Sequence, residues 1–137
     1  MSDCVFCRIA AGQIPAARID ESADHLAFLD IGPLAPGHTL LIPKQHFADI
    51  RDIPADLLSR LTSHLPRLAR AVFSATGASG LNVLQNSGST SGQAVFHFHI
   101  HLIPRVDGDK LGYRWNAGKY AGDEAREMQA KILAALA

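Results

Sequence analysis

Three histidines stand at every second position in the stretch HFHIHLIPR, which covers residues 97–105. Residues two apart in an extended strand share one face and lie about 6.5–7 Å apart. His97, His99 and His101 are therefore predicted to point the same way, with the apolar residues between them directed into a core. The outer two would lie about 13 Å apart, too far to bind one zinc ion. Imidazole is a nucleophile near neutral pH and, when protonated, a donor to phosphate, so the row favours chemistry over a strand that is merely polar on one face.

The segment just before this row, NSGSTSGQ at residues 86–93, is rich in glycine and serine. Such a loop can bring backbone N–H groups close to an anion. It is not a Walker A sequence, because no Gly-Lys-Ser/Thr follows, and by itself an ordinary flexible turn explains it equally well. Beside the histidines, it indicates phosphoryl chemistry.

A Cys-x-x-Cys pair, Cys4 and Cys7, lies in the first seven residues. Alone, this pair is compatible with zinc, with redox chemistry or with no function. Zinc would need two further ligands, and His46 in IPKQH and His97 in the histidine row are candidates. The alternative is a pair of reduced thiols packed against the sheet.

The composition excludes several classes of protein. The 137 residues carry 13 basic and 13 acidic side chains, so no excess positive field would attract a nucleic-acid polymer or an anionic membrane. No apolar run approaches the ~20 residues that span a bilayer, and the N-terminus lacks the pattern of a signal peptide. Two cysteines do not make a disulfide scaffold, so a cytoplasmic location is expected.

The elements expected from the sequence form one α+β domain, residues 1–137, with an antiparallel sheet of about five strands. One long helix should begin at Pro54 with Asp52 as a possible cap, and Pro66 should kink it or divide it into two consecutive helices. A short helix should precede a hairpin at the N-terminus, and an amphipathic helix should end the chain, with Met128, Ile132, Leu133 and Leu136 on its core side. The expected helices are 5–13, 54–75 and 122–137, and the expected strands are 16–22, 25–31, 38–44, 80–85 and 94–104.

The stretch HFHIHLI resembles the His-x-His-x-His-x-x signature of the histidine triad, or HIT, family of nucleotide hydrolases and transferases. The stretches CVFCRIAAGQIPA, LAFLDIGPLAPGHTLLIPKQH and NVLQNSGSTSGQAVFHFHIHLIPR are similar to the family's blocks in order and spacing. Together they cover most of residues 4–105, and the extension 106–137 is much less specific. The resemblance is to the Hint-like bacterial branch, and it implies a HIT-like fold and a homodimer whose sheets join around the long helix and a strand edge.

The resemblance also implies a mechanism. His99 would attack the α-phosphorus of a nucleotide, giving a nucleotidyl-phosphohistidine that water hydrolyses, and His101 would contact the phosphoryl oxygens and assist the leaving group. Asn86, Gly92 and Gln93 would complete the phosphate cradle. Ala94 stands where eukaryotic branches often carry serine or threonine, which leaves the leaving-group preference open.

The same resemblance assigns a nucleoside pocket and a metal site. Asp30 would accept from both ribose hydroxyls, although it could instead cap the following turn, and the apolar pocket residues could instead be plain core. Zinc would be structural, as in some family branches and in the related galactose-1-phosphate uridylyltransferases. The residues implied for the base are Phe6, Ile9, Phe28 and Ile31, and those implied for zinc are Cys4, Cys7, His46 and His97.

The sequence thus predicts a hydrolase of purine nucleoside phosphoramidates or related nucleotidyl adducts. The alternatives are a dinucleoside polyphosphate hydrolase and a zinc-stabilised nucleotide-binding module with negligible turnover. The other histidines are given lesser roles: His25 should begin a strand at the surface, His64 should be solvated, and His38 should at most hydrogen-bond near the triad. For three aromatic residues the sequence leaves substrate contact and packing equally open: Tyr113, Trp115 and Tyr120.

Overall fold

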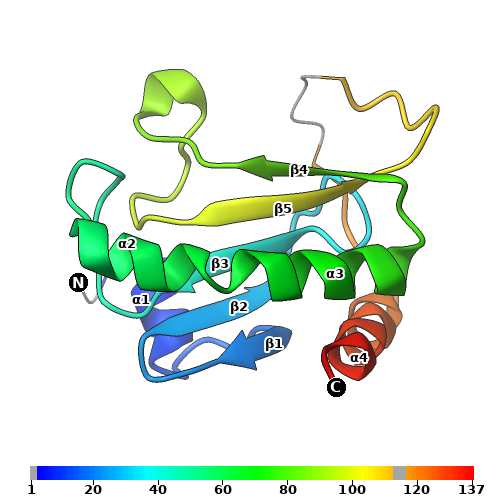
Figure 1. Ribbon diagram of the computed structural model, residues 1–137, viewed down its shortest axis with the longest axis horizontal. Helices are drawn as coiled ribbons and strands as arrows, with labels where there is room; N and C mark the ends of the chain where they lie inside the picture. The colour runs from blue at the N-terminus through cyan, green and yellow to red at the C-terminus, as the bar shows by residue number, and fades with distance from the viewer. Residues whose placement is uncertain (1–2, 113–116) are drawn as a thin grey trace.

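The computed structural model describes residues 3–112 and 117–137, so Tyr113 and Trp115 lie outside the described residues. Five strands form one sheet in the order β1-β2-β3-β5-β4, and each neighbouring pair is antiparallel (Figure 1). This confirms the α+β class and the five-stranded sheet. The strands are β1 (Arg18–Glu21), β2 (His25–Leu29), β3 (Thr39–Pro43), β4 (Gly80–Leu84) and β5 (Ile100–Arg105).

Helices cover both faces of the sheet. The short helix α1 (Val5–Ala10) lies behind the sheet in Figure 1, whereas α2 (Ala55–Thr62), α3 (Leu65–Thr76) and α4 (Glu124–Leu136) lie on the opposite face. The two central strands β2 and β3 are buried at every residue because of this double cover. Alternate residues of each strand therefore enter two separate apolar clusters, a large one under α2, α3 and α4 and a smaller one under α1.

The long helix is divided in two, as Pro66 predicts. The helix α2 ends at Thr62, and α3 begins at Leu65 with Pro66 in its first turn, where a missing N–H costs no hydrogen bond. The expected Asp52 cap is wrong. Pro54 occupies the N-cap position of α2, and Asp52 instead accepts a hydrogen bond from the Ala48 N–H at 3.1 Å.

The strand expected over 94–104 begins only at Ile100. Three pairs join it to β3, ending at Leu41 opposite Ile100. Beyond that point Pro43 has no N–H to donate, and its carbonyl accepts from the His97 ring at 2.7 Å. The ladder therefore stops, and His97 and His99 lie on the segment that leads into β5.

The C-terminal helix is confirmed, with one difference. Ile132 is fully buried in the large cluster, and Met128 and Leu136 pack against it, but Leu133 is 44% exposed. A step of one residue turns about 100° around a helix, which carries Leu133 away from the side that Ile132 buries. Among the described residues, no helix combines the length and apolarity needed to cross a membrane.

Candidate active site

The alternation predicted for the histidine row is present. Phe98, Ile100 and Leu102 enter the large cluster under the helices. The His99 and His101 rings lie 4.8 Å apart between centroids, on the α1 side of the sheet. All three histidines of the row are buried.

His99 is held in one tautomer. Its Nδ1 lies 2.7 Å from the carbonyl oxygen of His97, and a carbonyl can only accept, so Nδ1 carries the proton and Nε2 carries the lone pair. Burial lowers the pKa of His99, although the His97 carbonyl and Asp30 act in the opposite direction. The ring is therefore neutral at physiological pH and presents Nε2 as a nucleophile.

His38 sets the tautomer of His101 through a short chain of hydrogen bonds. The Leu34 N–H donates to Nδ1 of His38 at 3.0 Å, so the His38 proton lies on Nε2, which is 2.9 Å from Nδ1 of His101. Nδ1 of His101 accepts that bond, and the His101 proton lies on its own Nε2. Burial, followed by the neighbouring imidazoles, lowers the pKa of His38 to about 4 and that of His101 to about 3.

The Gly/Ser-rich loop is closed by its own hydrogen bonds. Gly88 and Gly92 have φ of 91° and 107°, a region that L side chains rarely adopt. The buried Gln93 side chain accepts from the Gly88 N–H at 2.7 Å and donates to the carbonyls of Ala48 and Val95 at 2.7 and 3.1 Å. Gln93 therefore fixes the loop shape, and the Gly92 N–H is bonded to Ser89 within it.

Asn86 connects this loop to the end of β4. Leu84 pairs with His101, so the register places Asn86, two residues further along, at the same end of the sheet as His99. Asn86 is buried, and a Cβ at position 92 would approach its side-chain nitrogen to 3.5 Å. The loop is thereby seated next to the histidine row.

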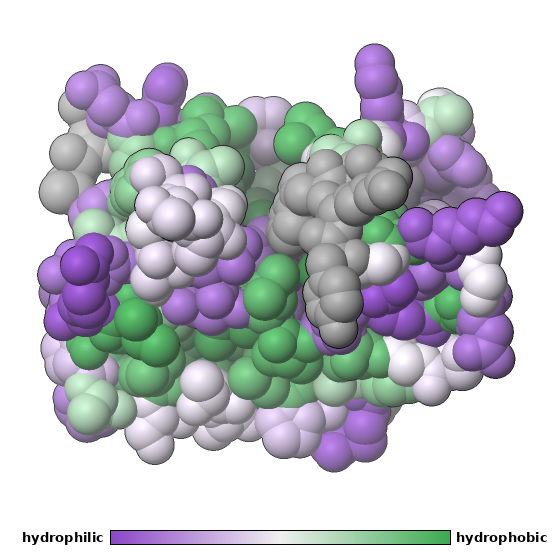
Figure 2. Space-filling view, turned by 90° about the horizontal axis from the view of Figure 1, so that it is seen from above, coloured by the Kyte–Doolittle hydropathy of each residue, from purple (hydrophilic) through white to green (hydrophobic). Residues whose placement is uncertain are grey.

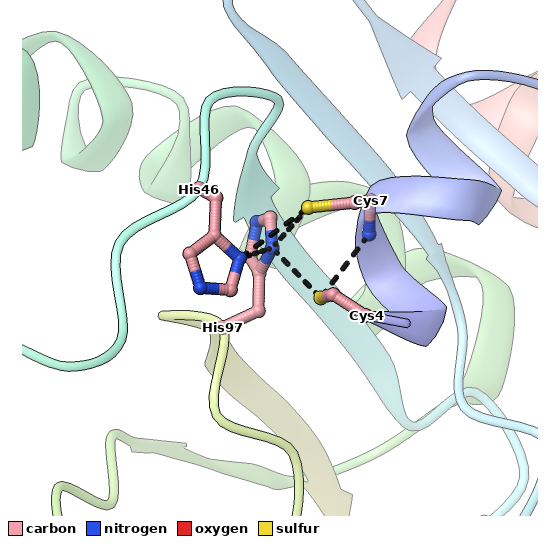
Figure 3. A group of neighbouring side chains, drawn as sticks. All are labelled: Cys4, Cys7, His46 and His97. Atoms are coloured by element: carbon pink, nitrogen blue, oxygen red, sulfur yellow. Dashed lines mark hydrogen bonds between the residues drawn. The ribbon is translucent and has the colours of Figure 1, made fainter. Parts of the chain in front are cut away.

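The four predicted zinc ligands converge on one point (Figure 3). Cys4 Sγ lies 3.4 Å from His97 Nδ1, Cys7 Sγ lies 3.3 Å from His46 Nδ1, and the two Nδ1 atoms are 3.2 Å apart. A tetrahedral zinc ion requires sulfur–nitrogen separations of about 3.6 Å and nitrogen–nitrogen separations of about 3.3 Å. The donor set fits that ion with small adjustments.

The protonation of this cluster also suits a cation. The Nε2–H of His97 donates to the Pro43 carbonyl, which leaves Nδ1 as the nitrogen that faces the thiols. Burial, followed by the hydrogen bond and charge of Cys4, raises the pKa of Cys7 to about 11. A divalent cation between the sulfurs would offset this effect and favour the thiolates.

A family model described as the HIT domain matches residues 11–108. The chain belongs to the HIT family. The match leaves out the first ten residues, which hold Cys4, Cys7, Phe6 and Ile9, and it includes every other residue predicted for the site.

Relatives and solved structures agree with this assignment. The chain is 37% identical to the adenosine 5'-monophosphoramidase HNT1 of Candida albicans, over 99% of this chain and 93% of that protein. It is 40% identical to the adenylylsulfatase HINT3 of Arabidopsis thaliana, over 80% of this chain and 56% of that protein. A Zn-bound histidine triad family protein from Mycobacterium smegmatis superposes with a TM-score of 0.87 at 40% identity, covering 98% of this chain and 94% of that chain.

The residues that the HIT resemblance assigns to the base are mostly core. Phe6, Ile9 and Phe28 belong to the small cluster under α1 and are 3–7% exposed. The Phe6 ring also packs perpendicular to the His99 ring, with centroids 5.1 Å apart at 90°. Ile31 differs because it is 93% exposed, so its side chain is open to a ligand.

Asp30 performs the turn-capping role with one oxygen and faces the histidines with the other. Oδ1 accepts from the Gly32 N–H at 2.9 Å, and Oδ2 is 3.6 Å from Nε2 of His38. Burial raises the pKa of Asp30, although the Gly32 N–H and His99 act in the opposite direction. Tyr120, whose role the sequence left open, packs against the large cluster and accepts from the Gly37 N–H.

Two histidine expectations are wrong. His25 does begin β2, but it is 3% exposed, and His64 is half-buried with its ring stacked on His25 at 3.7 Å between centroids. They come together because the turn between α2 and α3 lies over the start of β2, a contact between residues 39 positions apart that no local pattern reveals.

Proposed function

We propose that this HIT protein is a nucleotide hydrolase that releases a nucleoside monophosphate from purine nucleoside phosphoramidates or related nucleotidyl adducts. The observation that carries the proposal is the tautomer of His99, whose Nδ1 is held by the His97 carbonyl while Nε2 keeps its lone pair. The names of the Candida albicans and Arabidopsis thaliana relatives support it, because phosphoramidates and adenylyl sulfate both join a leaving group to the phosphorus of AMP.

The proposed reaction has two displacements at phosphorus. Nε2 of His99 forms a bond to the α-phosphorus as the bond to the leaving nitrogen or oxygen breaks, and the proton on Nε2 of His101 passes to the leaving atom. Water then attacks the same phosphorus and returns a proton to Nε2 of His101, while the N–P bond breaks and the monophosphate departs. The nitrogen needs no base for its attack because it carries no proton.

Binding is proposed to follow the family pattern. The Asn86 side chain and the loop residues Gly92 and Gln93 would surround the phosphate. Because Gln93 and the Gly92 N–H are engaged inside the loop, their part would be to hold the loop in shape. Ile31 and the few accessible atoms of Phe6, Ile9 and Phe28 would contact the base, with Asp30 on the ribose.

A structural zinc ion bound by Cys4, Cys7, His46 and His97 is part of the proposal. When bound, it would supply a fixed link between α1 and the segment that carries His99, and the separations of the four donors support it. Elemental analysis of untagged protein purified without chelator should give one zinc per chain. Chelation should lower Tm by roughly 10 °C; protein that holds no zinc, together with a Cys4→Ser variant of unchanged Tm, would remove zinc from the proposal.

A homodimer joined at the β4 edge is also proposed. Val83 and Leu84 on β4 are 52% and 37% exposed, and the view onto this edge shows apolar surface gathered along it (Figure 2). An uncovered apolar edge strand is a site for pairing with another chain. Light scattering at micromolar concentration should give twice the mass of one chain, and a single-chain mass would contradict the dimer.

The experiment that tests the function measures AMP release from adenosine 5'-phosphoramidate by the wild type and by His99→Ala. We expect the variant to lose at least ~10⁴-fold in kcat while AMP still binds. Turnover that survives in the variant would refute His99 as nucleophile. Faster cleavage of diadenosine tetraphosphate than of the phosphoramidate would favour a polyphosphate hydrolase, and AMP binding without turnover of either substrate would favour a binding module.

A further inference from the structure

We propose that Asp20, His25 and His64 form a second metal site, for a divalent transition ion such as Zn²⁺, Co²⁺ or Ni²⁺, on the sheet face opposite the histidine row. The three side chains come from β1, from the first residue of β2 and from the N-cap position of α3. One ligand atom from each lies within 4.8 Å of the others. The site shares no residue with the proposed zinc cluster or with the catalytic row.

The separations require only small movements. Nε2 of His25 lies 2.8 Å from Oδ2 of Asp20, whereas two ligands bound tetrahedrally at about 2.1 Å lie about 3.4 Å apart. An ion that replaces the proton between them needs this pair to widen by roughly 0.6 Å. His64 is half-buried and makes no capping hydrogen bond through its side chain, so its ring can turn from the stack toward the ion.

Ser22 allows the His25 ring to keep its proton when Nε2 binds a metal, because the proton can move to Nδ1. Oγ of Ser22 lies 2.7 Å from Nδ1 of His25 and accepts from the backbone N–H groups of Asp24 and His25 at 3.1 and 3.3 Å. Its hydroxyl can donate to Nδ1 while Nε2–H donates to Asp20, or it can accept from Nδ1–H in place of the longer backbone bond when Nε2 binds a metal. The imidazole proton then moves from Nε2 to Nδ1, and the serine fixes the ligand ring from outside.

The charged neighbours are balanced. Arg67 donates to Oδ2 of Asp20 at 3.0 Å, and the second lone pair of this oxygen, which accepts from His25, would bind the ion in place of that proton. Arg60 lies 3.7 Å from Asp24 at the rim. Asp24, the second carboxylate near the site, is thus paired with Arg60, and Arg67 is paired with Asp20.

A cavity of about 240 Å³ opens beside the ligands and gives the ion room for water or a small ligand. Its walls include His25 and His64, together with Ser22, Asp24, Arg60 and Ser63. Two imidazoles and one carboxylate suit borderline transition ions better than Mg²⁺ or Ca²⁺, which prefer oxygen ligands. Three protein ligands beside an open cavity leave at least one coordination position free.

The test uses Co²⁺ titrated into untagged full-length protein that a chelator has freed of metal. Co²⁺ bound by Cys4 and Cys7 gives intense thiolate charge-transfer absorption in the near ultraviolet, whereas Asp20, His25 and His64 give only weak visible bands. The variants are His64→Ala and Asp20→Asn, each of which removes one ligand. The matched control is Asp24→Asn, which removes a carboxylate from the same cavity wall but from no ligand position.

We expect the wild type and Asp24→Asn to bind one equivalent of Co²⁺ that adds no charge-transfer absorption. Any Co²⁺ at the thiolate site is a separate equivalent, which its charge-transfer absorption identifies. His64→Ala and Asp20→Asn should bind that equivalent at least ~100-fold more weakly, with unchanged Tm in the absence of metal for at least one of them. In NMR spectra of the wild type, the ring protons of His25 and His64 should broaden as the equivalent binds. A wild type that lacks this equivalent, or ligand variants that retain it, would overturn the proposal.

Discussion

Two groups of histidines lie on opposite faces of the same sheet, and they differ in what fixes their rings. On the face that carries the row, main-chain groups decide the tautomers. The His97 carbonyl holds His99, and the Leu34 N–H holds His38, which bonds to His101. On the other face, side chains hold His25, with Ser22 at Nδ1 and Asp20 at Nε2. A backbone carbonyl can only accept a hydrogen bond and a backbone N–H can only donate one, whereas a hydroxyl can do either.

The difference explains what each group is suited to do. A ring fixed by the backbone keeps the same nitrogen available through a reaction cycle, which nucleophilic attack at phosphorus requires. A ring fixed by rotatable side chains can exchange its proton for another ligand at little cost. Preset geometry therefore suits the proposed catalysis on one face, and adjustable geometry suits the proposed metal binding on the other.

After the loss of His99 itself, the largest effect should come from breaking the relay at His38. His38→Leu fills the same space but removes the donor to His101, whereas His38→Gln keeps an acceptor for Leu34 and a donor for His101. We expect kcat for phosphoramidate hydrolysis to fall roughly 10²-fold in the leucine variant, with KM nearly unchanged, because a wrong tautomer impairs proton transfer more than binding. Partial recovery of kcat in the glutamine variant would support the relay, and equal loss in both variants would indicate a packing role.

The next largest effect should be a loss of protein stability in acid, caused by the buried histidines His38 and His101. The pKa values of His38 and His101 lie at about 4 and about 3 in the fold, against about 6.5 in an unfolded chain. Between these pKa values the unfolded chain binds more protons than the folded protein. The contribution of the two histidines to the free energy of unfolding is therefore fully present above pH 6.5 and falls as the pH is lowered. Calorimetry between pH 7 and 4.5 should show Tm falling by roughly 10 °C. A His38→Leu protein with the same slope would show that other groups cause the fall.

A smaller effect should follow from a change in the Gly/Ser-rich loop that is proposed to surround the phosphate. Gln93→Ala leaves the Gly88 N–H and the Ala48 carbonyl without their partner, so the loop should loosen. We expect KM to rise roughly 10-fold, with a smaller change in kcat. Hydrogen exchange at the Gly88 amide of the ligand-free protein should accelerate. Unchanged exchange beside a raised KM would mean that Gln93 acts by touching the phosphate.

The smallest effect should come from a change on the face of the sheet that carries His25. Ser22→Ala removes three hydrogen bonds at the turn before β2 and should lower the free energy of unfolding by about 1 kcal/mol. The matched change Ser59→Ala lies on the exposed side of α2 and should stay within about 0.5 kcal/mol of the wild type. Urea unfolding of both variants measures the difference, and equal midpoints would show that Ser22 does not hold His25.

Local patterns were sufficient where the physics is local. Alternation placed Phe98 and Ile100 in the core and the histidines on the other side, and Pro66 divided the helix, because each result depends on neighbouring residues alone. The four proposed zinc ligands came together as the family resemblance implied. The HIT fold was recognised from the same stretches of sequence.

Contacts between distant segments decided the rest. The start of β5 depends on Pro43, more than 50 residues earlier, and the burial of His25 depends on the turn before α3. The relay from Leu34 through His38 to His101 needs a register between β3 and β5 that periodicity does not contain. The family resemblance implies phosphate contact for Gln93, and the structure adds a side-chain bond that reaches back to Ala48.

The six-residue helix α1 has a consequence for the order in which the molecule forms. A helix this short has no stability of its own in water, so it exists only while Phe6 and Ile9 are buried against the finished sheet. The same helix, with its N-cap residue, supplies the Phe6 ring beside His99 and the cysteine pair. We therefore expect the sheet and the three other helices to form first, and His99 to gain its final surroundings in the last step of folding. In native-state exchange of metal-free protein, α1 should open at the lowest free energy among the four described helices.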